Sequence, residues 1–278
     1  MRYIKTTNDE YYTTETFEGL GTATMNRSVA FLLLFFVLHT AKTDYDWCQY
    51  KCKKGIHTLC ERQKYDCGAG PACKNFQAMY MTNEDRQFII DLHNQLRNRV
   101  ALGHETIGPQ PSATNMQAMS YNTDLEYIAQ CHTNECVYHH DTCRSTSQWD
   151  WVGQSIMQEQ FIGQTITIRE MINSTIHGWY DEVKIYPPEW AKSFDTHGKK
   201  VGHYTQIVWA DTNHVGCGIT KYLEDGWETW YMACNYGPGG NAGAKPLYEQ
   251  GPPASNCGGL PRNPKYPGLC GTDTLQKV

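Results

Sequence analysis

The chain has 278 residues, 19% of them charged, and a formal net charge of −5 at neutral pH, a composition ordinary for a globular protein. The negative charge argues against nucleic acid as a main partner, because the phosphate backbone attracts basic surfaces. Twelve cysteines are unusual for a reducing cytosol. Their even number indicates disulfides formed in an oxidising compartment.

The first recognisable segment is an apolar run near the N-terminus. Residues 1–24 show no clear periodicity, and ten consecutive apolar residues, Val29–Leu38, follow shortly after Met25. A run of this length is too short to span a bilayer and fits a secretory signal peptide. We therefore expect a signal peptide at residues 25–41, an upstream reading-frame extension at residues 1–24, and a secreted product with no transmembrane segment. A signal-anchor helix is the weaker alternative, since no further apolar residues follow.

The next segment, residues 42–81, is rich in cysteine and has little apolar periodicity. Five cysteines lie between Asp46 and Cys73. Such a segment cannot bury enough apolar surface to fold alone, so it needs covalent crosslinks. We expect a disulfide-rich, loop-rich region here.

Three segments have the apolar spacing of amphipathic helices. The first begins at Thr82, where a side-chain cap and acidic residues precede apolar residues that recur as far as Val100. The second runs from Asp124, which can cap it, to Cys136. The third, Ile168–Val183, has the clearest apolar face. Within it, Asn173 begins an N-glycosylation sequon and points away from that face, so a glycan could attach there.

A β-hairpin is predicted in the C-terminal half of the chain. Val215–Leu223 and Trp227–Tyr236 are rich in β-branched and aromatic residues, and the Asp-Gly between them is a strong hairpin signal. If Asp225 and Gly226 form a two-residue turn, Cys217 and Cys234 lie equally far from it and face one another. They then occupy a non-hydrogen-bonded pair, with Cα atoms about 4.5 Å apart, a distance that a disulfide tolerates. The register therefore predicts a Cys217–Cys234 disulfide.

The sequence contains none of the catalytic motifs that we sought. It has no His-Glu-x-x-His, no Gly-x-Ser-x-Gly and no phosphate-binding loop. The tail from Pro252 onward is rich in proline and glycine, and we expect its two cysteines, Cys257 and Cys270, to pair locally.

Two motifs in the C-terminal half carry a resemblance to a known family. Gly202–Trp209 has the sequence Gly-His-Tyr-Thr-Gln-Ile-Val-Trp, and Tyr231–Asn241 has the sequence Tyr-Met-Ala-Cys-Asn-Tyr-Gly-Pro-Gly-Gly-Asn. In this order they resemble two signatures of the CAP superfamily of cysteine-rich secretory proteins, antigen five allergens and plant pathogenesis-related proteins. The cysteine spacing of Cys48–Cys60 narrows the resemblance to the antigen five-like venom allergens of insects.

The resemblance implies an α+β fold, a three-layer α-β-α sandwich with a small antiparallel sheet. Residues 82–250 would form this CAP domain, and residues 251–278 a C-terminal extension with a local disulfide. The family places a short helix at His203–Trp209, and we follow it, although propensity alone favours a strand there. The family's His-Asn-x-x-Arg element would be His93–Arg97, which we interpret as a helix flank that holds loops.

The resemblance also implies a pattern of crosslinks. Its pairs are Cys48–Cys60, Cys52–Cys143 and Cys67–Cys136. By elimination Cys73 and Cys131 remain as a further possible pair, although antigen five proteins with four disulfides lack both.

Four positions match the tetrad that lines the central cavity of CAP proteins: His140, Gln154, Glu182 and His203. Two imidazoles and a carboxylate in one cavity could bind a divalent metal ion, with His140, Glu182 and His203 as ligands. Gln154 stands where the family usually has glutamate, and glutamine is neither a general base nor a good zinc ligand. We therefore give equal weight to two interpretations of these four residues, a hydrogen-bonded cluster and a weak zinc site, and less weight to a proteolytic site.

The resemblance implies a secreted, non-enzymatic, antigen five-like protein of venom or saliva, and such proteins are frequent allergens. We expect a monomer that requires no cofactor and that binds a small lipid or sterol, or a host or prey protein. In some CAP proteins an aromatic loop binds sterol, and Tyr186, Trp190 and Phe194 lie in such a loop here. These rings could instead simply cover the core.

Two other classes of function remain as alternatives. The second hypothesis is a divalent-metal-dependent hydrolase that uses the His/Glu cavity. The third is an ion-channel ligand, which the tail disfavours because two cysteines are too few for the cysteine-rich domain of channel-binding relatives.

Overall fold

The computed structural model describes residues 46–50 and 52–275. The expected upstream extension and signal peptide lie outside the described residues. In the described part of the chain, no helix combines the length and the apolar character needed to cross a membrane.

The elements follow one another along the chain as a short helical region, a first strand and then alternating helices and strands. In order they are η1 (Trp47–Gln49), α2 (Thr58–Glu61), η2 (Gln63–Tyr65), β1 (Lys74–Ala78), α3 (Asn83–Ala101), β2 (Ser120–Tyr121), α4 (Thr123–Thr133), β3 (Gly153–Phe161), α5 (Ile168–Tyr180), η3 (Asp181–Ile185), η4 (Pro188–Lys192), α6 (Gly202–Ile207), β4 (His214–Glu224) and β5 (Trp227–Gly237).

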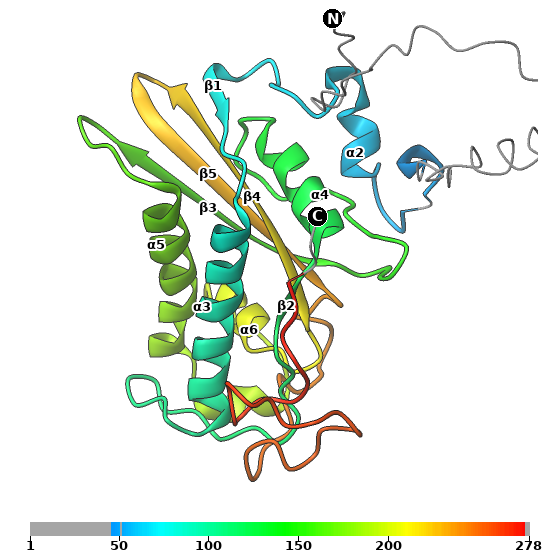
Figure 1. Ribbon diagram of the computed structural model, residues 1–278, viewed down its shortest axis with the longest axis vertical. Coiled ribbons are helices and arrows are strands. Elements are labelled where there is room, and N and C mark those ends of the chain that lie inside the picture. Colours follow the sequence, from blue (N-terminus) through cyan, green and yellow to red (C-terminus); the bar gives the residue numbers. More distant parts are fainter. Residues whose placement is uncertain (1–45, 51, 276–278) are drawn as a thin grey trace, which may run out of the picture. The chain divides into compact units, whose positions relative to one another are not determined.

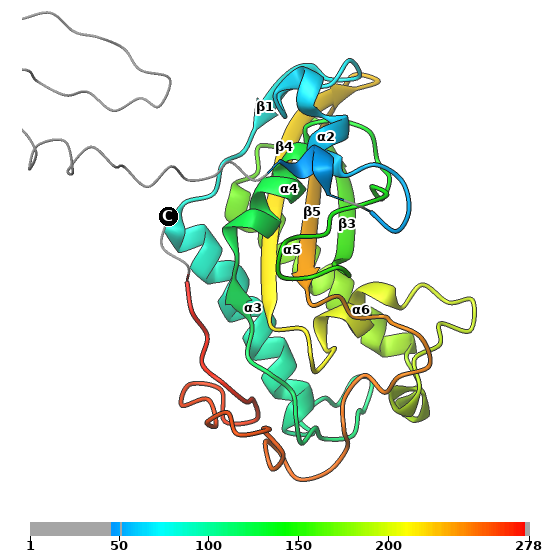
Figure 2. The ribbon, with the colours of Figure 1, turned by 90° about the vertical axis from the view of Figure 1, so that its right-hand side faces the viewer.

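These elements form three layers. Within the described residues, five strands make one sheet in the order β1-β4-β5-β3, with β2 parallel to β4 and the other pairs antiparallel. Figures 1 and 2 show α4 on one face of the sheet and α3, α5 and α6 on the other. The predicted α-β-α sandwich with a small antiparallel sheet is confirmed.

Local sequence signals account for where the long helices begin. The side chains of Thr82 and Thr167 cap α3 and α5, each in a reciprocal capping box with the acidic residue three positions on. The second helix differs from the prediction, because Asn122 caps it by accepting a hydrogen bond from the Leu125 N–H at 2.9 Å. The third helix ends at Tyr180 and continues as the tighter turn η3.

The largest core lies between the sheet and the helices α3, α5 and α6. Its fully buried members include Ile89, Ile176 and Trp179. Asn173 is exposed on the opposite side of α5, where a glycan would not disturb this core. The short helix expected after Gly202 is present as α6.

The hairpin has the predicted register. Glu224 pairs with Trp227 and Cys217 with Cys234, and the two cysteine Cα atoms are 4.0 Å apart. Asp225 and Gly226 have φ values of 51° and 86°, as a type I′ turn requires. This turn matches the twist of the strands, so the local sequence is sufficient to set the pairing.

Two of the expected disulfides are wrong in their partners. The pairs Cys48–Cys60, Cys52–Cys143, Cys217–Cys234 and Cys257–Cys270 agree with expectation. The structure however links Cys67 to Cys131 and Cys73 to Cys136, where we had expected Cys67–Cys136 and Cys73–Cys131.

Packing in two separate clusters explains why Cys67 and Cys73 have exchanged partners relative to the prediction. Cys131, on the last turn of α4, lies in a small cluster with Leu59, and Cys67 packs against that cluster. Cys136, beyond the helix end, belongs to a different cluster, against which Cys73 packs. Each cysteine therefore meets the partner in its own cluster, which the order along the chain does not reveal.

Both flanking segments are part of the fold. The N-terminal segment supplies β1, which pairs with β4. In the tail, the Cys270 N–H donates to the Met116 carbonyl and the Tyr121 N–H donates to the Thr274 carbonyl, at 2.8 and 2.9 Å. Leu269 in the tail is fully buried.

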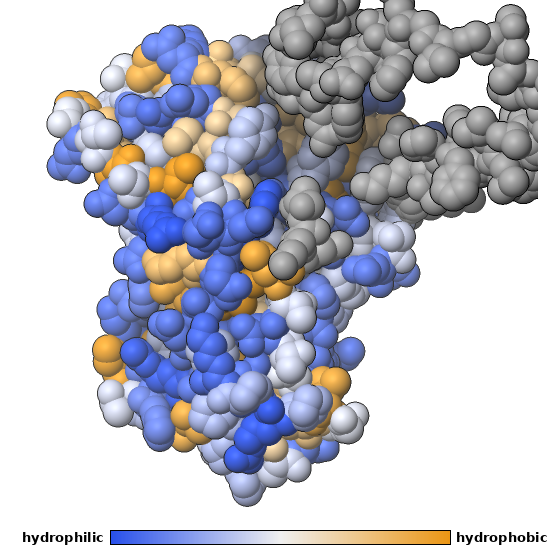
Figure 3. All heavy atoms as spheres, viewed as in Figure 1, coloured by the Kyte–Doolittle hydropathy of each residue, from blue (hydrophilic) through white to orange (hydrophobic). Residues whose placement is uncertain are grey.

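The face in Figure 3 is mostly hydrophilic, with apolar residues in separate groups.

Candidate functional site

The first half of the predicted tetrad is a pair formed by His140 and Gln154. His140 lies in the loop after α4, and Gln154 is near the start of β3, opposite Asn235 on β5. The Gln154 amide nitrogen donates to Asp141 and Asn235, both at 3.2 Å. Its oxygen therefore accepts from Nδ1 of His140 at 2.8 Å, so Nε2 of His140 carries the free lone pair.

The second half of the tetrad is a pair formed by Glu182 on η3 and His203 on α6. Nδ1 of His203 donates to one Glu182 oxygen at 2.7 Å. The ring of Trp179 stacks on the His203 ring with centroids 5.6 Å apart. The imidazole is therefore fixed from its edge and from its face.

The two pairs lie in one neighbourhood without forming a three-ligand metal site. Burial lowers the pKa of His140, and the nearby imidazole of His203 lowers it further. Across the described residues, however, the ligand atoms of His140, Glu182 and His203 are not grouped within 4.8 Å of one another. As the side chains lie, the tetrad is two separate hydrogen-bonded pairs, His140 with Gln154 and Glu182 with His203.

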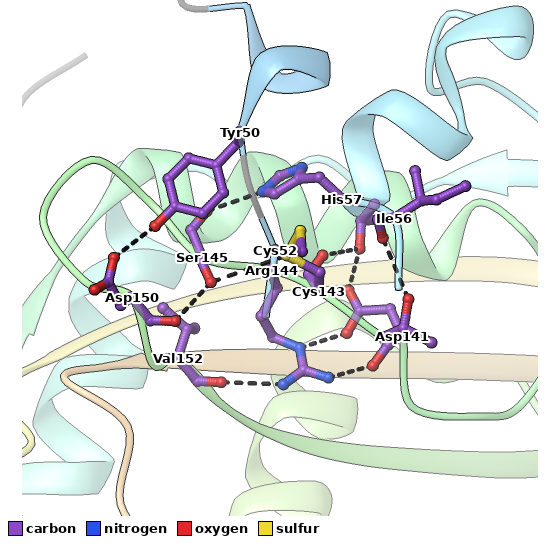
Figure 4. Close-up of a disulfide and its surroundings, with 12 residues drawn as sticks. Tyr50, Cys52, Ile56, His57, Asp141, Cys143, Arg144, Ser145, Asp150 and Val152 are labelled. Carbon is purple, nitrogen blue, oxygen red and sulfur yellow. Dashed lines mark hydrogen bonds and ion pairs between the residues drawn. A yellow bond between two sulfur atoms is a disulfide. The ribbon is translucent and has the colours of Figure 1, made fainter. Parts of the chain in front are cut away.

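A buried ion pair holds the loop that carries His140 (Figure 4). Asp141 forms an ion pair with Arg144 and accepts a hydrogen bond from the Thr58 hydroxyl. Burial alone would raise the pKa of Asp141, but Arg144 and its other partners hold it below the usual value. Arg144 also donates to the Val152 carbonyl at 3.0 Å, just before the strand that carries Gln154. The loop and β3 are thereby fixed relative to one another.

The disulfide in Figure 4, Cys52–Cys143, fastens the N-terminal segment to this same loop. His57 contacts the Ser145 carbonyl through Nε2 at 2.9 Å, and Tyr50 donates to Asp150 at 2.8 Å. The N-terminal segment thus stabilises the wall of the site although it supplies none of the tetrad.

The His-Asn-x-x-Arg element organises loops, in line with our interpretation. Arg97 is fully buried and donates to five backbone carbonyls, those of Gln117, Ile207, Trp209, Ala210 and Thr212. Asn94 both donates to and accepts from the backbone of Met119, at 3.0 and 2.7 Å. These contacts join α3 both to the segment just before β2 and to the end of α6 with the turn that follows it.

The predicted aromatic loop packs on the core. Tyr186 is 2% exposed, and the half-buried Trp190 meets it edge to face with ring centroids 5.8 Å apart. The half-buried Phe194 packs on Trp209 in the same manner, at 5.9 Å. This arrangement matches the alternative in which the rings cover the core.

Sequence reasoning missed a hollow beside this loop. A cavity of about 430 Å³ is lined by Trp149, Trp151 and Trp209, and its charged lining residues are Asp150, Asp211 and Lys245. Trp151 is 54% exposed, whereas Trp209 is 4% exposed. Trp209 lies far along the chain from Trp149 and Trp151, so the three gave no periodic signal, although the Gly-Pro-Gly-Gly run opposite them indicates close backbone approach.

Comparison with known proteins gives consistent matches. A model of the cysteine-rich secretory protein family, CAP, matches residues 90–236. Venom allergen 5.02 of Dolichovespula maculata is 39% identical over 211 residues, which cover 74% of this chain and 94% of the allergen. Venom allergen 5 of Vespa mandarinia is 41% identical over 212 residues, covering 74% and 99%. The crystal structure of NaASP2 with Zn²⁺ has a TM-score of 0.59 and 28% identity, covering 73% of this chain and all of that one.

Proposed function

Because the chain belongs to the cysteine-rich secretory protein family and resembles its antigen five venom allergens, we propose that it is a secreted, non-enzymatic protein that binds a small apolar ligand. The ligand class is a fatty acid or a sterol. The observation that carries this proposal is the tryptophan-lined cavity of about 430 Å³, a volume in the range of small-molecule sites.

The glycine run that faces the tryptophans forms the backbone wall against which their rings pack. A Cβ atom at Gly237 would lie 2.4 Å from the ring of Trp149, and one at Gly239 would lie 2.6 Å from the ring of Trp151. Trp151 also donates from its indole nitrogen to the Gly240 carbonyl at 3.1 Å. The indoles therefore lie directly against backbone, and a ligand can bind without first reorganising them.

The groups that line the cavity carry charges of both signs, Lys245 alongside Asp150 and Asp211. The support for an apolar ligand therefore comes from the indoles, above all the exposed ring of Trp151, which can cover an alkyl chain or ring system, while Lys245 can pair with a carboxylate head group. The aromatic loop adjoins the same cavity, since the Phe194 N–H donates to the Lys245 carbonyl at 2.7 Å. Of the predicted loop residues, Phe194 thus supports the wall of the cavity by packing against Trp209.

Fluorescent fatty-acid and sterol binding to the oxidised chain tests this proposal. Trp151→Ala should weaken binding about tenfold or more, because a central aromatic contact is lost. Trp227→Ala, which removes a tryptophan 41% exposed on the hairpin, is the matched control and should leave affinity unchanged. A triple variant in which Tyr186, Trp190 and Phe194 are replaced by alanine measures how much the loop contributes to the affinity for the ligand. Failure of the wild type to bind any fatty acid or sterol at micromolar concentration would refute the proposal.

The proposed lack of enzymatic activity rests on the state of the tetrad. Glu182 is the one carboxylate of the four, and its oxygens accept hydrogen bonds from the His203 ring and from the backbone N–H groups of His203 and Tyr204. Gln154 in the other pair cannot exchange protons. A carboxylate-pair mechanism therefore lacks its second member.

A further inference from the structure

Two histidines and a glutamate that the tetrad does not include come together at the end of α4. His132 lies on the last turn of the helix, Glu135 follows just beyond it, and His139 returns to the same place. One ring nitrogen of each histidine and one carboxylate oxygen of Glu135 lie within 4.8 Å of one another. Among the described residues this is the one group of three metal-ligating side chains that meets this distance.

The backbone that carries this cluster is fixed by covalent bonds. Cys136 has a φ of 58°, a left-handed conformation that reverses the chain between Glu135 and His139. The Cys67–Cys131 disulfide holds the helix before the reversal, and Cys73–Cys136 holds the reversal itself. The three side chains are therefore brought together by the fold before any ligand arrives.

Hydrogen bonds also orient both imidazole rings. His132 is 1% exposed, and its Nε2 lies 2.7 Å from the His139 carbonyl and 2.9 Å from the Tyr231 hydroxyl. Because the carbonyl can only accept, Nε2 of His132 carries the ring proton and Nδ1 carries the lone pair that a metal ion would bind. Nδ1 of His139 lies 2.9 Å from the His140 carbonyl, which can only accept, so Nδ1 carries the ring proton. Ring nitrogens held by carbonyl groups in this manner are typical of metal-binding histidines.

The lone pair of His139 faces a negative charge. Its Nε2 is 2.9 Å from a Glu135 carboxylate oxygen. A lone pair and a carboxylate at this separation repel one another unless a cation, either a proton or a metal ion, lies between them. The side chains of His139 and Glu135 are 44% and 31% exposed, so an ion can reach them from solvent.

We propose that His132, Glu135 and His139 form a binding site for a divalent transition-metal ion of the zinc type, separate from the cavity tetrad. Two imidazole nitrogens and one carboxylate oxygen, with water in the fourth position, are a donor set that suits zinc rather than calcium or magnesium. Ligand atoms around a tetrahedral zinc ion are about 3.4 Å apart, since each bond is about 2.1 Å long.

Cobalt and zinc titrations of the oxidised full chain test the site. Co²⁺ should give the absorption bands of tetrahedral coordination, and Zn²⁺ should displace it. His139→Ala and Glu135→Gln should each weaken binding about tenfold or more. These exposed ligands are chosen because replacing the buried His132 would also disturb packing, and circular dichroism confirms that each variant is folded.

Two further variants separate this site from other histidines. His177→Ala removes an exposed histidine from α5 and should leave the titration unchanged. His203→Ala removes a ring from the tetrad and should leave the tetrahedral cobalt bands unchanged. The proposal is overturned if the wild type shows no tetrahedral cobalt bands, if His139→Ala binds as tightly as the wild type, or if His203→Ala abolishes the bands.

Discussion

Glu182 binds His203 twice, through the ring Nδ1 at 2.7 Å and through the backbone N–H at 2.9 Å. The carboxylate oxygen that accepts from the His203 backbone also accepts from the Tyr204 N–H, at 3.0 Å. Glu182 therefore holds the first turn of α6 in place. A carboxylate already engaged by three donors has little remaining capacity for a metal ion.

We accordingly predict weak zinc binding in the tetrad that does not survive dialysis. The measurement is calorimetry in a His139→Ala background, which removes the second cluster. His203→Ala should abolish the remaining binding. Gln154→Glu should strengthen it about tenfold by adding an anionic ligand. If the His139→Ala protein and its two derivatives, with His203→Ala or Gln154→Glu added, bind zinc with equal affinity, the tetrad residues do not share a site. Peptide hydrolysis that is lost in His203→Ala would contradict the non-enzymatic proposal.

A second prediction concerns His93 and acid stability. Burial lowers the pKa of His93 from 6.5 to about 4, and the positive charge of Arg97 acts in the same direction. Between these pH values the unfolded chain binds a proton that the folded chain does not, so stability should fall as pH drops from 6.5 towards 4. The loss attributable to this residue is about 3 kcal/mol.

Urea unfolding at pH 7 and at pH 4.5 measures this loss. His93→Gln should be less stable than the wild type at pH 7, because the contacts of the ring with Ile89 and Tyr236 are changed. It should however lose less stability on acidification. An identical loss in both proteins would show that another group is responsible.

A third prediction concerns the carbonyl cluster around Arg97. Lysine has three donors on one atom and cannot reach five carbonyls that surround a planar guanidinium. Arg97→Lys should therefore lower the free energy of unfolding by about 3 kcal/mol. Arg99→Lys is the matched control, because that side chain is 51% exposed on the same helix and should change stability little. If both variants unfold at the same urea concentration, the carbonyl contacts of Arg97 do not stabilise the fold.

A fourth prediction concerns the close approach of α4 to the sheet. A Cβ atom at Gly218 on β4 would lie 2.3 Å from the backbone nitrogen of Gln130 and 2.6 Å from the backbone of Ala129. Gly218→Ala should force α4 away from the sheet and cost about 2 kcal/mol.

Gly178 on α5 provides the contrast for thermal unfolding. A Cβ atom there would find its nearest neighbour at 3.6 Å, and alanine favours a helix over glycine by about 0.8 kcal/mol. Gly178→Ala should therefore raise the melting temperature while Gly218→Ala lowers it. Equal melting temperatures for the two variants would contradict this account of the packing between α4 and the sheet.

The features that could be predicted from sequence are those set by neighbours along the chain. The hairpin register followed from one Asp-Gly turn, which placed Cys217 opposite Cys234 before any tertiary contact was known. Thr82 and the acidic residue three positions on marked the start of α3. The helix at Gly202 needed the family motif, because its β-branched and aromatic residues alone favour a strand.

Tertiary structure decided which distant groups meet. The partners of Cys67 and Cys73 depend on packing at the C-terminal end of α4, where Cys131 lies in a cluster with Leu59 and Cys136 lies in a cluster with residues of the strands. The division of the tetrad into two pairs likewise depends on tertiary packing, whereas His132 and His139, seven residues apart, meet because the chain reverses locally at Cys136. Sequence fixes short-range backbone preferences because a few bonds separate the interacting groups, whereas long-range contacts depend on how the layers close around the core.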